Sequence, residues 1–408
     1  MDIKNYKQEL AAELRQLLAY WMDHSIDKKL GGFYGSIDQN NSINAEASKG
    51  AVQNARILWT FSAAYNFTGD KKYLPVAERA YAYLIDHFTD KVYGGVYWSV
   101  DALGNPLNQR KQIYGLAFYL YGLSEYYQGV KEPLVLQQAV ALFKLMEEKS
   151  FDAIHKGYFE AFARDWQPLL DLRLSDKDAN EKKTMNTHLH VIEAYATLYK
   201  QWPDDLLRNR IVQLLQVFDE HMIDKKTGHL VLFFDEYWKE KPDVISYGHD
   251  IEAAWLLQQC AEIIKDEQWI DKMKHYAITV TRAAMQGLDA DGGLWYEYDT
   301  AGNHLVKEKH WWPQAEAMVG FFNAWEITAD ANYLHASLNS WQFIKKWIRD
   351  DVHGEWFWGV NEDHTVMKEN DKLGFWKCPY HNSRACMEII KRITALESSA
   401  TAQSLVPV

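Results

Sequence analysis

The sequence predicts an all-α protein in which six helix pairs close into a toroid, an (α/α)6 barrel with short β-hairpin excursions. The main observation is a glycine-centred motif that returns six times along the 408 residues. The motif glycines are Gly32, Gly95, Gly157, Gly228, Gly293 and Gly354, separated by steps of 63, 62, 71, 65 and 61 residues. Such a near-constant period indicates a repeat architecture, and each period has room for two helices.

Each copy of the motif has the same local pattern. An aromatic residue stands two places after the glycine in five of the six copies. An aspartate precedes the glycine by four or five places in every copy: Asp27, Asp90, Asp152, Asp224, Asp289 and Asp350. Alternating aromatic residues after a turn are typical of a short extended segment, so we expect a hairpin excursion between the helices of each pair.

Apolar residues at helical spacing predict the helices themselves. The first stretch, 1–21, carries Leu10, Leu14 and Leu17 between polar residues and predicts an amphipathic helix rather than a signal peptide. Further helices are predicted at 51–65, 74–87, 112–127 and 133–149. Each helix pair leaves an apolar face uncovered, and six pairs can cover these faces by closing into a ring. An open solenoid would need polar capping repeats at both ends, and neither end of the sequence looks like such a repeat.

One domain accounts for nearly the whole chain. No Pro/Gly/Ser-rich linker divides it, so we predict a single barrel domain over 1–396. Residues 397–408 lack a periodic pattern and are predicted to form a disordered tail.

Composition narrows the class of protein. A net charge of −12 argues against nucleic acid or an anionic membrane as a partner, because both require a concentrated basic face. The odd number of cysteines, Cys260, Cys378 and Cys386, predicts reduced thiols, and no apolar run is long enough to cross a bilayer, so a cytoplasmic location is expected. The 17 Trp and 24 Tyr indicate a large aromatic core, and some of these rings could form a platform for a sugar.

Polar residues recur where the second helix of each pair is predicted to begin. His249 and Glu252 are three apart and share one helix face, Gly248 is expected to allow a tight entry into that helix, and His190 with Glu193 repeats the spacing. The remaining helix starts offer Arg56, Tyr114, Asn186, Trp311, Trp312, Glu316, Trp376 and His381. In a closed ring these starts converge at one rim, which predicts a polar site there.

Two imidazoles facing each other suit the removal and return of a proton on the carbon next to an aldehyde, because both titrate near neutral pH. A guanidinium such as Arg56 could stabilise the enediolate formed in between, although it could also be a structural group paired with a glutamate. We expect no metal ion, because His188 and His190 are two apart and do not share a helix face. Glu193 and Glu316 are expected to orient their neighbours.

Four motifs together resemble the cellobiose 2-epimerase branch of the N-acylglucosamine 2-epimerase superfamily. They are Met185-Asn186-Thr187-His188-Leu189-His190, Gly248-His249-Asp250-Ile251-Glu252-Ala253, Trp311-Trp312-Pro313-Gln314-Ala315-Glu316 and Trp376-Lys377-Cys378-Pro379-Tyr380-His381. The resemblance covers nearly the whole chain, and the histidines after Met185-Asn186 favour the cellobiose branch.

The resemblance implies reversible epimerisation at C2 of the reducing-end glucose of β-1,4-linked disaccharides such as cellobiose and lactose, without metal or nucleotide. His249 and His381 would be the acid/base pair, with Glu252 tuning His249, and Arg56 and His190 would hold the open-chain oxygens. Further binding positions by resemblance are Tyr114, Asp178, Asn186, Trp312, Trp376 and Glu316. Asp176 competes with Asp178 for its role.

Other functions stay open at this point. An aldose–ketose isomerase acting on mannose would share the ring and both histidines, and an N-acylglucosamine 2-epimerase would be stimulated by ATP. A glycoside hydrolase would need two carboxylates flanking the scissile bond. From another class, the ring could be an inactive sugar-binding or interaction module. We expect a monomer or a weak homodimer.

Overall fold

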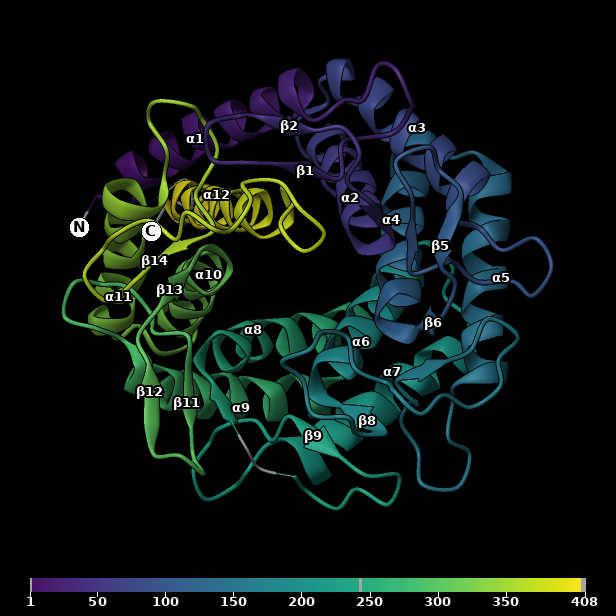
Figure 1. Ribbon diagram of the computed structural model, residues 1–408. Coiled ribbons are helices and arrows are strands. Elements are labelled where there is room, and N and C mark those ends of the chain that lie inside the picture. Colours follow the sequence, from purple (N-terminus) through teal and green to yellow (C-terminus); the bar gives the residue numbers. More distant parts are fainter. Residues whose placement is uncertain (1, 242–243, 405–408) are drawn as a thin grey trace.

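The computed structural model describes residues 2–241 and 244–404 and shows a closed ring of helices around a central axis (Figure 1). The helices alternate along the chain between an outer and an inner ring. The inner helices are α2 (Ala51–Thr68), α4 (Ile113–Val130), α6 (Met185–Gln201), α8 (Tyr247–Ile264), α10 (Trp311–Thr328) and α12 (Tyr380–Ser404). Each packs on the next, and α12 packs on α2, so the predicted (α/α)6 toroid is confirmed.

The outer ring surrounds the inner one. Its members are α1 (Ile3–His24), α3 (Leu74–Tyr83), α5 (Pro133–Lys149), α7 (Asp205–Val217), α9 (Glu267–Ala284) and α11 (Ala331–Phe343). Short π-helical turns extend three of them at Leu84–Phe88, Phe218–Met222 and Ile344–Ile348, and 3-10 turns lie at Lys71–Tyr73 and Met285–Gly287. The predicted helix at 74–87 is therefore α3 with its π-helical extension.

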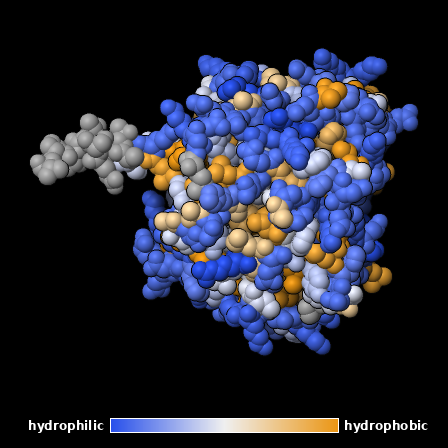
Figure 2. Space-filling view, turned by 90° about the vertical axis from the view of Figure 1, so that its left-hand side faces the viewer, coloured by the Kyte–Doolittle hydropathy of each residue, from blue (hydrophilic) through white to orange (hydrophobic). Residues whose placement is uncertain are grey.

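The helices of the two rings differ in how much of their surface is buried. In α2 every residue from Ala51 to Ala64 is buried, because neighbours surround an inner helix on all sides. In α5 burial is confined to one stripe, Val135, Ala139, Leu142, Phe143 and Met146, as expected for a helix with one face in water. The side of the molecule in Figure 2 is accordingly mostly hydrophilic, with smaller apolar areas.

The first and last helices lie side by side and complete the ring. Helices α1 and α12 pack together, and Lys7 Nζ contacts Glu397 Oε2 at 2.6 Å. Helix α12 continues to Ser404, past the boundary predicted at residue 396. Of the tail predicted to be disordered, residues 405–408 lie outside the described residues.

Short strands link each repeat to the next at one rim. The two-residue segment before an inner helix pairs antiparallel with a hairpin strand of the following repeat. The strands are β1 (Ser36–Ile37), β2 (Ile43–Asn44), β3 (Lys49–Gly50), β4 (Ser99–Val100), β5 (Pro106–Asn108), β6 (Lys111–Gln112), β7 (Ala161–Phe162), β8 (Lys183–Thr184), β9 (Phe233–Phe234), β10 (Val244–Ser246), β11 (Glu297–Asp299), β12 (His304–Val306), β13 (Lys309–His310) and β14 (Gly359–Val360). Their sheets are β1-β2, β3-β4-β5, β6-β7, β8-β9, β10-β11-β12 and β13-β14.

The repeated aspartates hold these hairpins in place. Asp90, for example, accepts hydrogen bonds from the backbone N–H groups of Val92 and Tyr93. In five repeats the aspartate also pairs with a buried lysine: Lys49–Asp27, Lys111–Asp90, Lys183–Asp152, Lys309–Asp289 and Lys372–Asp350, at 2.6–3.1 Å. The repeated aspartates therefore correspond to buried Asp–Lys ion pairs at the rim of the barrel.

The fourth repeat departs from this rule. Ile245 stands two residues before α8, where the first, second, third and fifth repeats have the lysine. Instead, Asp250 in the first turn of α8 pairs with His229 Nδ1 at 2.6 Å and accepts from the Leu230 N–H at 2.8 Å. This repeat carries His249, so its helix start is held from within the helix rather than from the strand before it.

None of the helices within the described ranges combines the length and apolar character needed to cross a bilayer.

Candidate active site

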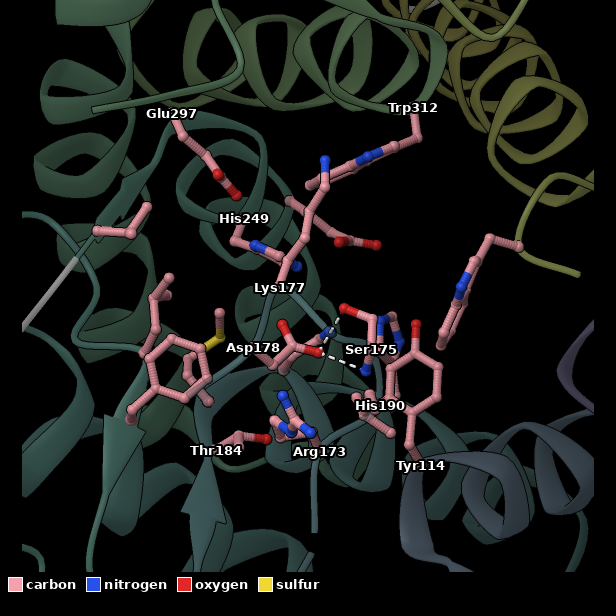
Figure 3. A pocket seen from close by; sticks show the side chains of 18 of the residues that line it. Tyr114, Arg173, Ser175, Lys177, Asp178, Thr184, His190, His249, Glu297 and Trp312 are labelled. Carbon is pink, nitrogen blue, oxygen red and sulfur yellow. Dashed lines mark hydrogen bonds between the residues drawn. The ribbon is translucent and has the colours of Figure 1, made fainter. Parts of the chain in front are cut away.

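A cavity of about 310 Å³ opens at the rim where the inner helices begin (Figure 3). The first two turns of those helices and the rim loops and hairpins both contribute to its lining, which is why sequence positions far apart meet there. Among the predicted site residues the cavity is lined by Arg56, Tyr114, Asp178, Asn186, His190, His249, Glu252, Trp312, Trp376 and His381. Asp176 is not among the lining residues, so the structure favours Asp178 of the two aspartates.

His249 lies in the first turn of α8 against an aromatic wall. Its Nδ1 is 2.9 Å from Ser246 Oγ, and its ring centroid is 4.8 Å from that of Trp312. Burial, followed by the nearby His190, lowers the pKa of His249 to about 3. The ring is therefore neutral at pH 7 in the ligand-free cavity, and Nε2 is the nitrogen left to meet a ligand.

His381 lies at the start of α12 and is held by a carboxylate. Its Nδ1–H donates to Glu316 Oε1 at 2.7 Å, and its ring centroid is 5.6 Å from that of Trp312. Burial, and then the cationic Arg56 and Arg384, lower the pKa of His381 well below its usual value, while a carboxylate partner favours the charged form. Trp312 thus lies beside both imidazoles.

His190 and Arg56 form a second pair of polar groups in the cavity. His190 Nδ1 lies 3.0 Å from Glu193 Oε2, as their spacing of three residues predicted. The Arg56 guanidinium stacks 4.1 Å from the Phe118 ring and donates to the Tyr114 hydroxyl at 2.7 Å. Arg56 Nε and Asn186 Oδ1 are buried and have no hydrogen-bond partner among the described residues.

Beneath the histidines, Arg384 of α12 gathers three glutamates from three inner helices. Its Nη2 donates to Glu252 at 2.6 Å and to Glu316 at 2.7 Å, and its Nη1 donates to Glu193 at 2.5 Å. Burial would raise the pKa of Glu193, but Arg384, His190 and Tyr380 lower it to about 2. Burial and the charge of Glu316 raise the pKa of Glu252 to about 8.

This cluster also tests the possibility of a metal site. Ligand atoms of Glu252, Glu316 and His381 all lie within 4.8 Å of one another. The guanidinium of Arg384 already donates to both carboxylates and supplies the positive charge that a metal ion would bring. The geometry therefore fits an arginine-centred network better than a cation site.

The outer part of the cavity is shaped by the loop at 172–179 and the hairpin of the fifth repeat. Asp178 Oδ2 accepts from the Ser175 hydroxyl at 2.9 Å, while Lys177 and Glu297 reach over the opening (Figure 3). Burial raises the pKa of Glu297 to about 7. Burial likewise raises the pKa of Glu160 to about 8, although Thr184 and Thr187 both donate to its carboxyl group.

Three expectations from the sequence need correction. Glu252 bonds to Arg384, and Ser246 rather than Glu252 holds His249. Glu316, predicted to bind substrate, is absent from the cavity wall and supports His381 from behind. Of the two possibilities left open for Arg56, the structure favours the site residue, since Arg56 lines the cavity and donates to the Tyr114 hydroxyl.

The third correction concerns Gly248, which lies inside the first turn of α8 rather than in front of the helix. A Cβ at this position would come within 2.5 Å of the Trp312 ring. The glycine is needed because the backbone of α8 approaches that indole closely, not because of a tight entry.

His188 has a structural role that explains why only His190 reaches the cavity. His188 Nε2 accepts from the Tyr158 N–H at 2.8 Å, and its Nδ1 lies 2.7 Å from the Thr184 carbonyl oxygen. Asp250 and Gln314 occupy the corresponding helix position in later repeats and likewise accept the N–H of a hairpin residue, Leu230 or Leu294. This fourth position of the inner helix fastens the helix to its hairpin.

Sequence reasoning missed several residues of the site: Ser246, Arg384, Glu160, Lys177, Tyr296, Glu297, His310 and Trp358. A signal existed for Arg384, because it follows His381 by three positions and therefore shares its helix face. The hairpin residues carried no such signal, since only the fold brings them to the cavity.

Comparison with known proteins agrees with this architecture. Residues 32–385 match the N-acylglucosamine 2-epimerase (GlcNAc 2-epimerase) family. A protein of Bacteroides fragilis named cellobiose 2-epimerase is 47% identical over 385 residues, covering 94% of this chain and 98% of its own length. One of the same name from Dictyoglomus turgidum is 36% identical and covers 96% of this chain and 100% of its own length.

A solved structure of cellobiose 2-epimerase from Bacillus thermoamylovorans B4167 superposes with a TM-score of 0.90 at 37% identity. The superposition covers 95% of this chain and 100% of the other. Matches of this extent include the barrel, the rim and the cavity together. The chain belongs to the N-acylglucosamine 2-epimerase family, a family of sugar epimerases.

Proposed function

We propose that this chain reversibly epimerises C2 of the reducing-end glucose of β-1,4-linked disaccharides, converting cellobiose to glucosyl-mannose and lactose to epilactose. The observation that carries the proposal is the pair of imidazoles, His249 and His381, which line one cavity and both lie next to Trp312. In both rings an oxygen atom holds Nδ1, so both present Nε2 to a ligand. The names of the relatives support cellobiose as substrate.

The reaction needs a base on one face of C2 and an acid on the other. After ring opening, one neutral imidazole takes the proton from C2, and the electron pair of the broken C–H bond forms the enediolate with the C1 carbonyl. The other imidazole, in its protonated form, delivers a proton to the opposite face of C2, so the two rings exchange protonation states. The negative charge of the enediolate raises the pKa of both rings, which burial lowers in the ligand-free cavity.

The remaining groups of the cavity suit an open-chain sugar. Arg56 supplies a permanent positive charge for the enediolate oxygens, and His190 supplies a second polar contact. Trp312 and Trp376 offer flat rings to the C–H faces of the sugars, and Tyr114, Asn186 and Asp178 offer hydrogen bonds to hydroxyl groups. We propose that the reaction needs no metal ion or nucleotide.

The proposal is tested by incubating the protein with cellobiose, and separately with lactose, in heavy water and following the products by NMR. We expect a mannose-ended disaccharide that carries deuterium at C2. Accompanying ketose would show reprotonation at C1 and thus partial isomerase character. Free monosaccharides would instead indicate a hydrolase, and binding without any product would indicate an inactive ring; either result contradicts the proposal.

If both disaccharides stay unchanged, free mannose and then N-acetylmannosamine with ATP distinguish the related activities of an isomerase and an N-acylglucosamine 2-epimerase. We further propose that the protein acts in the cytoplasm as a monomer or weak homodimer. Light scattering coupled to size exclusion tests the oligomeric state.

A further inference from the structure

The hydroxyl group of Ser246 has no assigned role in the reaction, yet it contacts His249 directly. Ser246 ends strand β10 and is the N-cap residue of α8. It is fully buried, and its Oγ lies 2.9 Å from Nδ1 of His249. Three residues separate the two, so the serine and the imidazole belong to one helix turn.

A serine at an N-cap ordinarily accepts a hydrogen bond from the backbone N–H two or three residues later. Ser246 makes no such bond within the described residues, and its hydroxyl is instead directed to the side chain three residues on. Thr184, the N-cap of α6, shows the ordinary arrangement, since its Oγ1 accepts from the Thr187 N–H. The Ser246 hydroxyl therefore contacts the imidazole of His249 and does not cap the helix.

The start of α8 is held by other groups, so it does not depend on a serine cap. Asp250 accepts from the Leu230 N–H at 2.8 Å and pairs with His229 at 2.6 Å. Both partners are buried, which makes this attachment a strong one. A hydroxyl at position 246 is thus free to serve the ring of His249 without loss of the helix start.

We infer that Ser246 is a positioning residue that accepts a hydrogen bond from Nδ1–H of His249 and keeps the lone pair of Nε2 available for the proton at C2. This inference rests on the function proposed above. A neutral imidazole has one N–H, so a hydroxyl that accepts from Nδ1–H leaves Nε2 as the base, whereas a hydroxyl that donated to Nδ1 would leave the hydrogen on Nε2. When Nε2 takes the proton from C2, Nδ1 keeps its hydrogen and the hydroxyl keeps its accepting role, so the contact persists through the step.

The contact between His249 and Trp312 cannot replace the hydrogen bond to Ser246. Trp312 meets His249 at 4.8 Å with its planes tilted by 50°, which packs the ring but leaves its tautomer unconstrained. Without the hydroxyl, either nitrogen can carry the proton, and the tautomer with hydrogen on Nε2 is unable to act as a base. Loss of this hydrogen bond is expected to lower kcat by about tenfold, with KM for cellobiose nearly unchanged.

The test compares Ser246→Ala with Ser246→Thr, which keeps the hydroxyl in an extended segment that accepts β-branched residues. Ser150→Ala is the matched control, because that buried hydroxyl donates to the Met146 carbonyl at 2.8 Å and ends an outer helix. For each protein, kcat and KM are measured with cellobiose. The histidine tautomers are read from 15N–1H long-range couplings in the ligand-free state, with His249→Asn used to assign the signal of His249.

We expect Ser246→Ala to lose about tenfold in kcat and to shift His249 from the Nδ1–H tautomer to a mixture, whereas Ser246→Thr and Ser150→Ala keep both properties of the wild type. An unchanged tautomer and an unchanged kcat in Ser246→Ala would overturn the assignment. If the wild-type protein turns over neither disaccharide, the proposed function fails, and the tautomer measurement alone then decides whether Ser246 sets the state of the ring.

Discussion

Both imidazoles of the cavity contact Trp312, yet they differ in what holds them. His381 donates to a carboxylate, Glu316, which itself belongs to the charge network around Arg384. Among the described residues, His249 contacts the hydroxyl of Ser246 and the indole of Trp312. Burial lowers the pKa of both rings, and the cations Arg56 and Arg384 lower that of His381 further, against the effect of its carboxylate partner.

This difference in partners bears on the proposed proton exchange. Burial favours the neutral form of both rings, and Glu316 offers His381 a carboxylate where Ser246 offers His249 a hydroxyl. The comparison teaches that the groups that hold Nδ1, rather than the imidazoles themselves, distinguish the two histidines.

The largest expected effect comes from removing either ring. His249→Ala and His381→Ala are each expected to abolish turnover of cellobiose, a loss of at least about 1,000-fold, because each proton transfer then lacks its donor or acceptor. Steady-state rates measure the loss, and circular dichroism checks that the barrel is intact. A near-wild-type rate in either folded variant would contradict a mechanism that uses both histidines.

A smaller effect is expected when only the carboxylate is neutralised. Glu316→Gln keeps the shape of the side chain but weakens the support of His381, and we expect kcat to fall by about 10- to 100-fold. Glu252→Gln is the matched control, since Glu252 accepts from the same Nη2 of Arg384 but its Oε1 lies 3.9 Å from His381 Nδ1, beyond hydrogen-bond distance. Equal losses in both variants would mean that the charge network as a whole, not the contact with His381, matters.

The smallest effect concerns stability and pH. Burial lowers the pKa of His249 to about 3, so above its unfolded value of about 6.5 the ring is neutral in both states and has no influence. Below that pH the unfolded chain binds a proton that the folded ring does not, and the free energy of unfolding falls by about 1.4 kcal/mol per pH unit until the folded ring titrates near pH 3.

Urea unfolding at pH 7 and pH 5 measures this contribution. His249→Asn is expected to lose up to about 2 kcal/mol less than the wild type between the two pH values. Parallel losses in wild type and His249→Asn would show that the folded ring accepts a proton as readily as the unfolded chain.

The barrel could be predicted from sequence because its signals are local and repeated. Each glycine and aspartate acts within a few residues of its own hairpin, as Asp90 does with Val92 and Tyr93, so the pattern survives without knowledge of the fold. The cavity could be predicted in outline for a related reason. Arg56, His190 and His249 occupy equivalent helix starts, and a ring places equivalent positions together.

The contacts within the cavity could not be predicted, because they join helices that the sequence does not align. The spacing of three residues gave the right partner for His190 but the wrong one for His249. Glu193 accepts from Arg384 and also contacts His190. Glu252 accepts from Arg384 instead of contacting His249, which lies on the same helix as Glu252. Ser246 was overlooked because a serine before a helix ordinarily indicates only a cap.

The contact between Lys7 and Glu397 has a consequence for the order of the chain. Because the first and last helices meet on the same wall, the order of the repeats is cyclic and the starting point is arbitrary with respect to the fold. A short linker could join the first and last helices, and new termini could be opened at the exposed hairpin tip around Leu103, where the Asp101 turn closes on itself. The barrel is therefore a scaffold for circular permutation, in which every repeat can in principle be made the first.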